Sequence, residues 1–110
     1  MEAVKHFIQR NIYKKIYLKD AASHVGLSQK YLSRIFEEIT GEGFNSYKLR
    51  LKTEKAKELL TGTGQTVDQI SYKIGYENTE SFMSGFKKLT KMTPTEFRKK
   101  SREHGKKSKL

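Results

Sequence analysis

An internal repeat is the feature that most constrains how this chain can fold. Residues 18–39 resemble residues 67–89: each segment has the pattern of an amphipathic helix, a glycine turn and a second, capped helix. Matched positions lie 49 residues apart up to the glycine and 50 apart beyond it. The matches are Leu18 with Val67, Ala21 with Ile70, Val25 with Ile74, Gly26 with Gly75, Ser28 with Asn78, Leu32 with Phe82, and Phe36 with Phe86. Two helix-turn-helix units are therefore predicted.

The rest of the chain also carries helical spacing, and no segment sustains the alternation of a strand. Helices are predicted over about 2–13, 18–25, 29–39, 45–61, 67–74 and 79–90, with a short last helix that opens at Pro94. The third helix is expected to bury Leu32, Ile35, Phe36 and Ile39. The fold class is thus all-α, with seven helices and two helix-turn-helix lobes joined by a long linker helix.

These elements predict one domain over residues 1–100. Lobe one covers about 2–43, the linker helix about 45–61, and lobe two about 65–100. Residues 101–110 consist mainly of Lys, Ser, Gly and His and are predicted to form a basic, disordered tail. The aromatic residues expected in the core are Phe36, Tyr47, Phe82, Phe86 and Phe97.

The formal net charge of +11 is large for 110 residues and predicts a polyanionic partner, nucleic acid or an anionic membrane. Residues 98–109 hold seven basic residues and one acidic residue, which leaves +5 for the rest of the chain. A merely solvated basic surface is the alternative. No run of 18 apolar residues and no signal peptide is present, so a cytoplasmic protein without a membrane partner is expected.

Enzymatic and metal sites find no support in the sequence. There is no cysteine, and His6, His24 and His104 each lack a second ligand at helical spacing. No glycine-rich phosphate loop and no set of nucleophile, base and orienting residue is present. We therefore expect no catalytic residues, no metal and no cofactor.

Two helix-turn-helix units in a basic chain favour binding to double-stranded DNA. A major groove admits one helix, and equivalent groove faces recur about every 34 Å, so two units on a linker helix can enter successive grooves. Two other classes remain open: a protein-interaction module, and non-specific RNA or membrane binding through the tail.

Several runs of residues also match a known pattern. They are Leu18–Ser28, Tyr31–Phe36, Thr40-Gly41, Phe44 with Tyr47, Ala56 with Leu59-Leu60, Val67–Ser71, Ile74-Gly75-Tyr76, Phe82, Phe86-Lys87-Lys88, Thr93-Pro94 and Phe97-Arg98. Through these runs, the chain over about 4–100 resembles the AraC/XylS family of bacterial transcription regulators. The resemblance implies that the third and sixth helices read adjacent major grooves and that the fourth links the lobes.

The resemblance also implies partners. Most family members carry a separate sensor or receiver domain, so this chain is expected to be the output domain of a larger regulator, with a small standalone activator as the alternative. RNA polymerase is a partner of the members that activate transcription.

Site residues follow from family position. Those expected to face bases are Lys30, Ser33, Arg34, Thr79, Glu80, Met83 and Ser84, and those expected at phosphates are Ser28, Gln29, Tyr31, Asn78, Lys87 and Lys88. Arg34 can pair with guanine O6 and N7 together, Thr79 or Met83 can touch a thymine methyl, and Glu80 can accept from cytosine N4. For Ser28 a cap role is at least as strong a reading as a DNA role, and Asn78 is expected to cap its helix first and to bind phosphate second. Glu80 can equally favour the helix dipole.

Some residues depart from the family pattern. Lys52 stands where an arginine is usual, Glu37-Glu38 where two lysines are frequent, Ser84 where an arginine is common, Gly85 where a larger apolar residue is common, and Lys91 where a turn glycine is usual. Glu37-Glu38 weakens any phosphate contact from the end of the third helix. Because Ser84, Gly85 and Lys91 weaken the second unit, we predict that the first unit supplies most of the base discrimination and that the second is softer.

Overall fold

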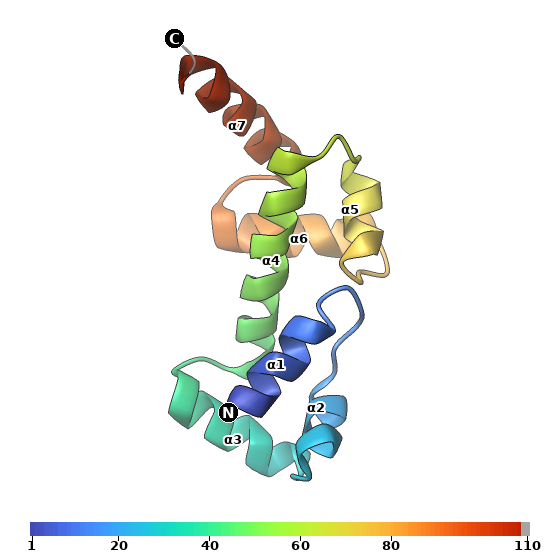
Figure 1. The fold of residues 1–110 in the computed structure, drawn as a ribbon, viewed down its shortest axis with the longest axis vertical. Helices are drawn as coiled ribbons and strands as arrows, with labels where there is room; N and C mark the ends of the chain where they lie inside the picture. The colour runs from blue at the N-terminus through green and yellow to red at the C-terminus, as the bar shows by residue number, and fades with distance from the viewer. Residues whose placement is uncertain (109–110) are drawn as a thin grey trace. The chain divides into compact units, whose positions relative to one another are not determined.

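The computed structural model describes the backbone of residues 1–108 and the side chains of residues 1–103, and in this range it contains seven helices and no strand (Figure 1). The helices are α1 (Glu2–Arg10), α2 (Leu18–Val25), α3 (Gln29–Thr40), α4 (Phe44–Gly62), α5 (Val67–Lys73), α6 (Thr79–Thr90) and α7 (Pro94–Ser108). The predicted all-α class is confirmed. None of the helices within residues 1–108 combines the length and hydropathy that a membrane crossing requires.

Two helix ends differ from the sequence-based prediction. α1 stops at Arg10, because the Asn11 side chain donates to the Phe7 carbonyl at 2.8 Å and competes with the helix for that acceptor. α7 runs to Ser108 and is not short, since it is rich in Lys, Arg and Glu, which are good helix formers. It therefore enters the segment that was predicted to be a tail, whose last two residues, 109 and 110, lie outside the described part.

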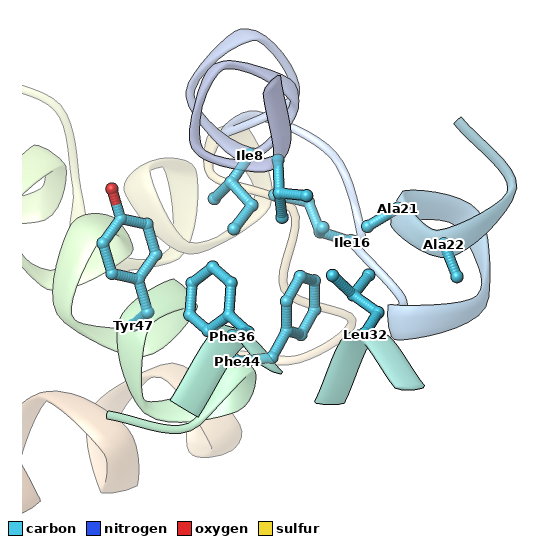
Figure 2. Packing of buried hydrophobic residues seen from close by; sticks show 9 residues of the cluster. Ile8, Ile16, Ala21, Ala22, Leu32, Phe36, Phe44 and Tyr47 are labelled. Atoms are coloured by element: carbon cyan, nitrogen blue, oxygen red, sulfur yellow. The ribbon is translucent and has the colours of Figure 1, made fainter. Parts of the chain in front are cut away.

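The chain divides into two compact units, and the first comprises Met1–Lys52. Side chains from α1, α2, α3 and the start of α4 converge in its core (Figure 2). Phe36 of α3 meets Phe44 and Tyr47 of α4 edge to face, with ring centroids 5.8 and 5.3 Å apart. This aromatic cluster fastens the second helix of the helix-turn-helix to the helix that follows it.

Ile39 is the error in the predicted core, because it is 65% exposed. The inward position in the last turn of α3 belongs instead to Thr40, whose Oγ1 donates to the Phe36 carbonyl at 2.7 Å. Gly41 then turns the chain with φ +82°, so that no further helical turn covers Ile39.

Unit 2 begins at Thr53 and has its own core. Ala56 and Leu60 of α4 pack with residues of α5 and α6, and Phe82 and Phe86 are both buried. Phe86 meets Phe97 of α7 edge to face at 5.5 Å. The other members of this cluster are Leu59, Ile70 and Ile74, with Val67 and Tyr76 packed against it.

The structure extends the repeat beyond the segments that the sequence matched. Thr90 ends α6 as Thr40 ends α3, with its Oγ1 donating to the Phe86 carbonyl at 2.9 Å. The contact between Phe86 and Phe97 reproduces the contact between Phe36 and Tyr47, 50 positions earlier. Each unit is therefore a helix-turn-helix followed by a left-handed turn and the first turns of another helix.

The two repeats differ in the residue that follows the second helix of each helix-turn-helix: Gly41 in unit 1 and Lys91 in unit 2. Lys91 adopts φ +66° at the position where unit 1 has Gly41, and it is the only non-glycine with positive φ among the described residues. We expect Lys91→Gly to raise the free energy of unfolding by about 1 kcal/mol, because a side chain disfavours this conformation. Denaturant unfolding measures the change.

The matched control is Gly41→Ala. A Cβ at Gly41 would meet no atom within 4 Å, so this variant tests the conformation alone and should lose a similar amount of stability. A neutral or destabilising Lys91→Gly would contradict the prediction.

Candidate nucleic-acid interface

The face of unit 1 that is predicted to contact DNA, called the reading face below, is the exposed face of α3. Gly26 turns the chain with φ +72°, and Ser28 caps α3 by accepting the Tyr31 amide at 3.2 Å. The expected cap role of Ser28 is confirmed. The residues on the solvent side, all exposed as predicted, are Gln29, Lys30, Ser33, Arg34 and Glu37.

Arg34 does not project freely from this face. Its guanidinium carbon lies 5.4 Å from the centroid of the Tyr31 ring, a cation–π arrangement between successive turns of α3. Ser28, Lys30, Tyr31 and Arg34 line one open hollow of about 340 Å³. Two basic groups, a hydroxyl and a ring thus gather at the N-terminal end of α3, which is suited to polar, negatively charged groups.

The corresponding face of unit 2 is on α6. Asn78 caps this helix by accepting the Ser81 amide at 2.8 Å, which confirms its expected cap role. Glu80 and Ser84 are exposed, whereas Met83 is half-buried. Lys87 and Lys88 are both exposed in the last turn. The surface presented by α6 is therefore less basic at its N-terminal end than that of α3.

Side-chain hydrogen bonds tie the turn of unit 2 together. The Thr79 hydroxyl donates to the Asp68 carboxylate at 2.6 Å, which joins α6 to α5. The buried Ser71 hydroxyl donates to the Asn78 carbonyl at 3.3 Å, and Thr66 and Gln69 form a capping box at the start of α5. These bonds act against the softness expected from Gly85, which stays a prediction for amide exchange to test.

Lys52 is part of the internal structure of unit 1. It is 5% exposed, and its ammonium donates to the carbonyls of Ile12 and Lys14 at 2.8 and 2.9 Å. Burial, with a smaller effect of the Lys48 charge, lowers the pKa of Lys52 to about 8. The family pattern marked Lys52 only as a replacement for an arginine, whereas the structure shows that it ties down the segment between α1 and α2.

Two more basic side chains, Lys48 and Arg98, also donate hydrogen bonds to backbone carbonyls far away in the chain. Lys48 donates to the Ile16 carbonyl at 2.7 Å, and burial lowers its pKa. Arg98, 50 positions later, donates to the carbonyls of Leu60 and Thr63 at 3.0 and 3.3 Å. Arg98, the first of the seven basic residues in 98–109, therefore holds the end of α4. The continued offset of 50 was the sequence signal that could have revealed this role.

The position of Lys52 has a consequence for pH dependence. Its pKa is about 8 in the folded protein against 10.5 for an ordinary lysine, so between these values the unfolded chain binds more protons. We expect the free energy of unfolding to rise from pH 8 to 10 in the wild type relative to Lys52→Met, measured by urea unfolding. Equal pH profiles for the two proteins would contradict this prediction.

Acidic and apolar groups lie at the C-terminal end of α3. Glu37, Glu38 and Ile39 are all exposed there. In unit 2 the matched positions hold Lys87, Lys88 and Leu89, and Leu89 is 44% exposed. The last turn of α3 thus repels phosphates where the last turn of α6 attracts them.

Comparison with known proteins finds matches over most of the chain. Residues 21–100 match a family model described as a helix-turn-helix domain. Regulatory protein PocR from Salmonella typhimurium is 30% identical over 104 residues, which make up 94% of this chain and 34% of PocR. The chain therefore spans about a third of the length of this relative.

Solved structures match over about nine tenths of the chain. The C-terminal domain of the two-component response regulator yesN from Fusobacterium nucleatum has a TM-score of 0.85 and 31% identity, covering 88% of this chain and 95% of that one. A transcriptional regulator from Chromobacterium violaceum, described as an AraC-type DNA-binding domain-containing protein, has a TM-score of 0.82 and 27% identity, covering 91% and 89%.

Proposed function

The chain belongs to the AraC-type helix-turn-helix family of DNA-binding domains, and from this premise we propose that it is the DNA-reading part of a transcription regulator. In this proposal α3 and α6 each enter a major groove, and the two grooves are adjacent along one duplex. The observation that carries the proposal is the exposed, basic face of α3, on which the Arg34 guanidinium lies over the Tyr31 ring.

In unit 1, Lys30, Ser33 and Arg34 contact base edges. Arg34 has the principal part, because a guanidinium on a fixed support presents its two donors to guanine with less loss of conformational freedom. Gln29 and the Ser28 hydroxyl donate hydrogen bonds to phosphates. Tyr31 was expected at a phosphate, and its ring position beneath Arg34 adds a supporting role to that contact.

In unit 2, the base-facing residues are Thr79, Glu80, Met83 and Ser84. The side-chain oxygen of Asn78 caps α6, so its side-chain NH2 group is left to donate to a phosphate. Lys87 and Lys88 bind the backbone, so their contribution is independent of sequence. Unit 1 thus supplies most of the base discrimination, and unit 2 adds affinity and register.

The full-length protein is proposed to be larger than this chain. PocR extends well beyond the matched region, and the yesN match is the C-terminal domain of a response regulator. A sensor or receiver domain is therefore the proposed companion, and the cytoplasm is the proposed location. Membership in a family of DNA-binding domains favours binding over catalysis as the function of the chain.

Transcription activation through RNA polymerase is proposed from the end of α3. Glu37, Glu38 and Ile39 are exposed but do not suit phosphate contact, so they are open to a protein partner. A variant with Glu37→Ala and Glu38→Ala should keep DNA affinity and lose activation of a reporter gene. Unchanged activation would refute this part of the proposal.

The DNA proposal is tested by selecting binding sites from random duplexes. Two short boxes about one helical turn apart are the expected result. The affinity for the selected duplex should fall steeply with salt, with a slope of about −0.9 per neutralised phosphate. A protein-interaction module would select no boxes and would show little duplex affinity even at low salt.

Lys87→Ala refines this test. Because Lys87 is proposed to contact the backbone, the variant should weaken binding to all duplexes alike and reduce the salt slope by about one. Titrations of selected and scrambled duplexes at several salt concentrations measure both effects. A loss confined to the selected duplex would place Lys87 at a base.

A further inference from the structure

The contact between Thr79 and Asp68 commits a hydroxyl that the base-reading surface would otherwise offer. Thr79 is the first residue of α6, and its Oγ1 lies 2.6 Å from Oδ1 of Asp68 on α5. An ionised carboxylate only accepts hydrogen bonds, so the threonine is the donor. A threonine hydroxyl has one proton, and in this arrangement the proton points toward α5.

The same bond fixes where the rest of the side chain lies. Threonine is branched at Cβ, so holding Oγ1 against Asp68 also sets the direction of the Cγ2 methyl group. The backbone on the N-terminal side is held as well, since Ser71 donates to the Asn78 carbonyl and Asn78 caps the Ser81 amide. The bond to Asp68 thus favours one rotamer of Thr79, and the bonds of Ser71 and Asn78 hold the backbone that carries it.

We propose that Asp68 is a positioning residue that makes Thr79 read thymine through its methyl group, not through a donated hydroxyl proton. The proposal rests on the entry of α6 into the major groove. The thymine C5-methyl is an apolar feature of that groove and distinguishes thymine from cytosine. A free hydroxyl would be less selective, because it can rotate to donate to several acceptors.

The device is specific to unit 2. The positions that match Asp68 and Thr79 in unit 1 hold Lys19 and Gln29, which are residue types that cannot form a carboxylate–hydroxyl bond. The one-residue insertion in the second turn lies between the two bonded residues. The hydrogen bond between Asp68 and Thr79 therefore joins α5 to α6 in unit 2, and the residues at the matching positions of unit 1 cannot form it.

Two substitutions at Thr79 separate methyl from hydroxyl. Thr79→Val keeps the methyl and removes the hydroxyl, whereas Thr79→Ser does the reverse. Sites are selected from random duplexes with each protein, and affinities are then measured with every base at the position that changes. Thr79→Val should keep the preference for thymine, because valine carries a methyl group at both γ positions and needs no hydrogen bond to Asp68 to present one. Thr79→Ser should reduce the preference about fivefold. Lost preference in Thr79→Val, or full preference in Thr79→Ser, would overturn methyl reading.

Two substitutions at Asp68 test the positioning role. Asp68→Asn removes the charge but keeps an acceptor for Thr79, and Asp68→Ala removes both. Because both lose the same charge, any general electrostatic gain in affinity cancels between them. Asp68→Ala should lower the thymine preference about as much as Thr79→Ser, while Asp68→Asn keeps it. Equal preference in all Asp68 variants would remove Asp68 from the mechanism.

The result also distinguishes this inference from the function on which it rests. If no substitution at Thr79 altered preference at any base pair while Arg34→Ala did, Thr79 would not read a base and this inference would fall, while the proposed DNA-binding function would stand. Thermal unfolding of each variant provides the folding control, because a merely structural role would change the melting temperature and not the preference at one base pair.

Discussion

Arg34→Ala is expected to weaken binding to the selected duplex by about 1–3 kcal/mol and to relax the preference at one base pair. The reason is that Arg34 stands exposed on the reading face with its guanidinium over the Tyr31 ring, at the edge of the hollow that Ser28 and Lys30 also line. In the proposed complex Arg34 donates two hydrogen bonds to one guanine, and the substitution removes both. Titrations against the selected duplex and its single-base variants measure both effects.

The matched control is Arg10→Ala. Arg10 is also an exposed arginine of unit 1, but it lies in the last turn of α1, outside the reading face. Its loss should change affinity little and preference not at all. Arg34→Lys keeps the charge without the planar fork and should retain general affinity while losing discrimination. If Arg34→Ala kept the full preference, α3 would not be the reading helix in the way proposed.

Phe36→Ala is expected to cost about 3–5 kcal/mol of stability. Phe36 is fully buried and joins α3 to the start of α4 through its ring contacts with Phe44 and Tyr47 (Figure 2). The variant leaves a cavity in the core that holds the reading helix in place. Denaturant unfolding gives the loss, and amide exchange shows where it falls.

The matched variant in unit 2 is Phe86→Ala, since Phe86 occupies the same position against Phe97. Because each unit has its own core cluster, we expect faster amide exchange mainly in residues 1–52 for Phe36→Ala and mainly beyond residue 53 for Phe86→Ala. Identical exchange patterns would show that the two cores unfold as one, contrary to this prediction.

Much of the fold could be predicted because its determinants are local. Helical spacing located all seven helices, Gly26 and Gly75 marked left-handed turns, and Ser28 and Asn78 capped the helices they were expected to cap. Each of these features depends on residues within four positions of one another. The exposed face of α3 followed from the same periodicity, and so did the candidate residues on it.

Other features required the tertiary structure, because they depend on residues far apart in the chain. Lys52 binds carbonyls 38 and 40 positions away, and Arg98 holds the end of α4 over a similar distance. Periodicity placed Ile39 inside, yet it is exposed because Thr40 ends the packed face. Sequence also offered Thr79 as a possible methyl contact without showing what holds its hydroxyl.

Local sequence and tertiary packing each determined a different part of the repeat. From the sequence alone, two helix-turn-helix units and the residues on their outer faces could be inferred, since amphipathic spacing, turns and caps are encoded within each segment. What each outer residue is free to do was decided by packing: the Tyr31 ring lies against the Arg34 guanidinium, and Asp68 accepts a hydrogen bond from the Thr79 hydroxyl. A hydrogen bond between two helices is decided by how they pack, and periodicity carries no information about it.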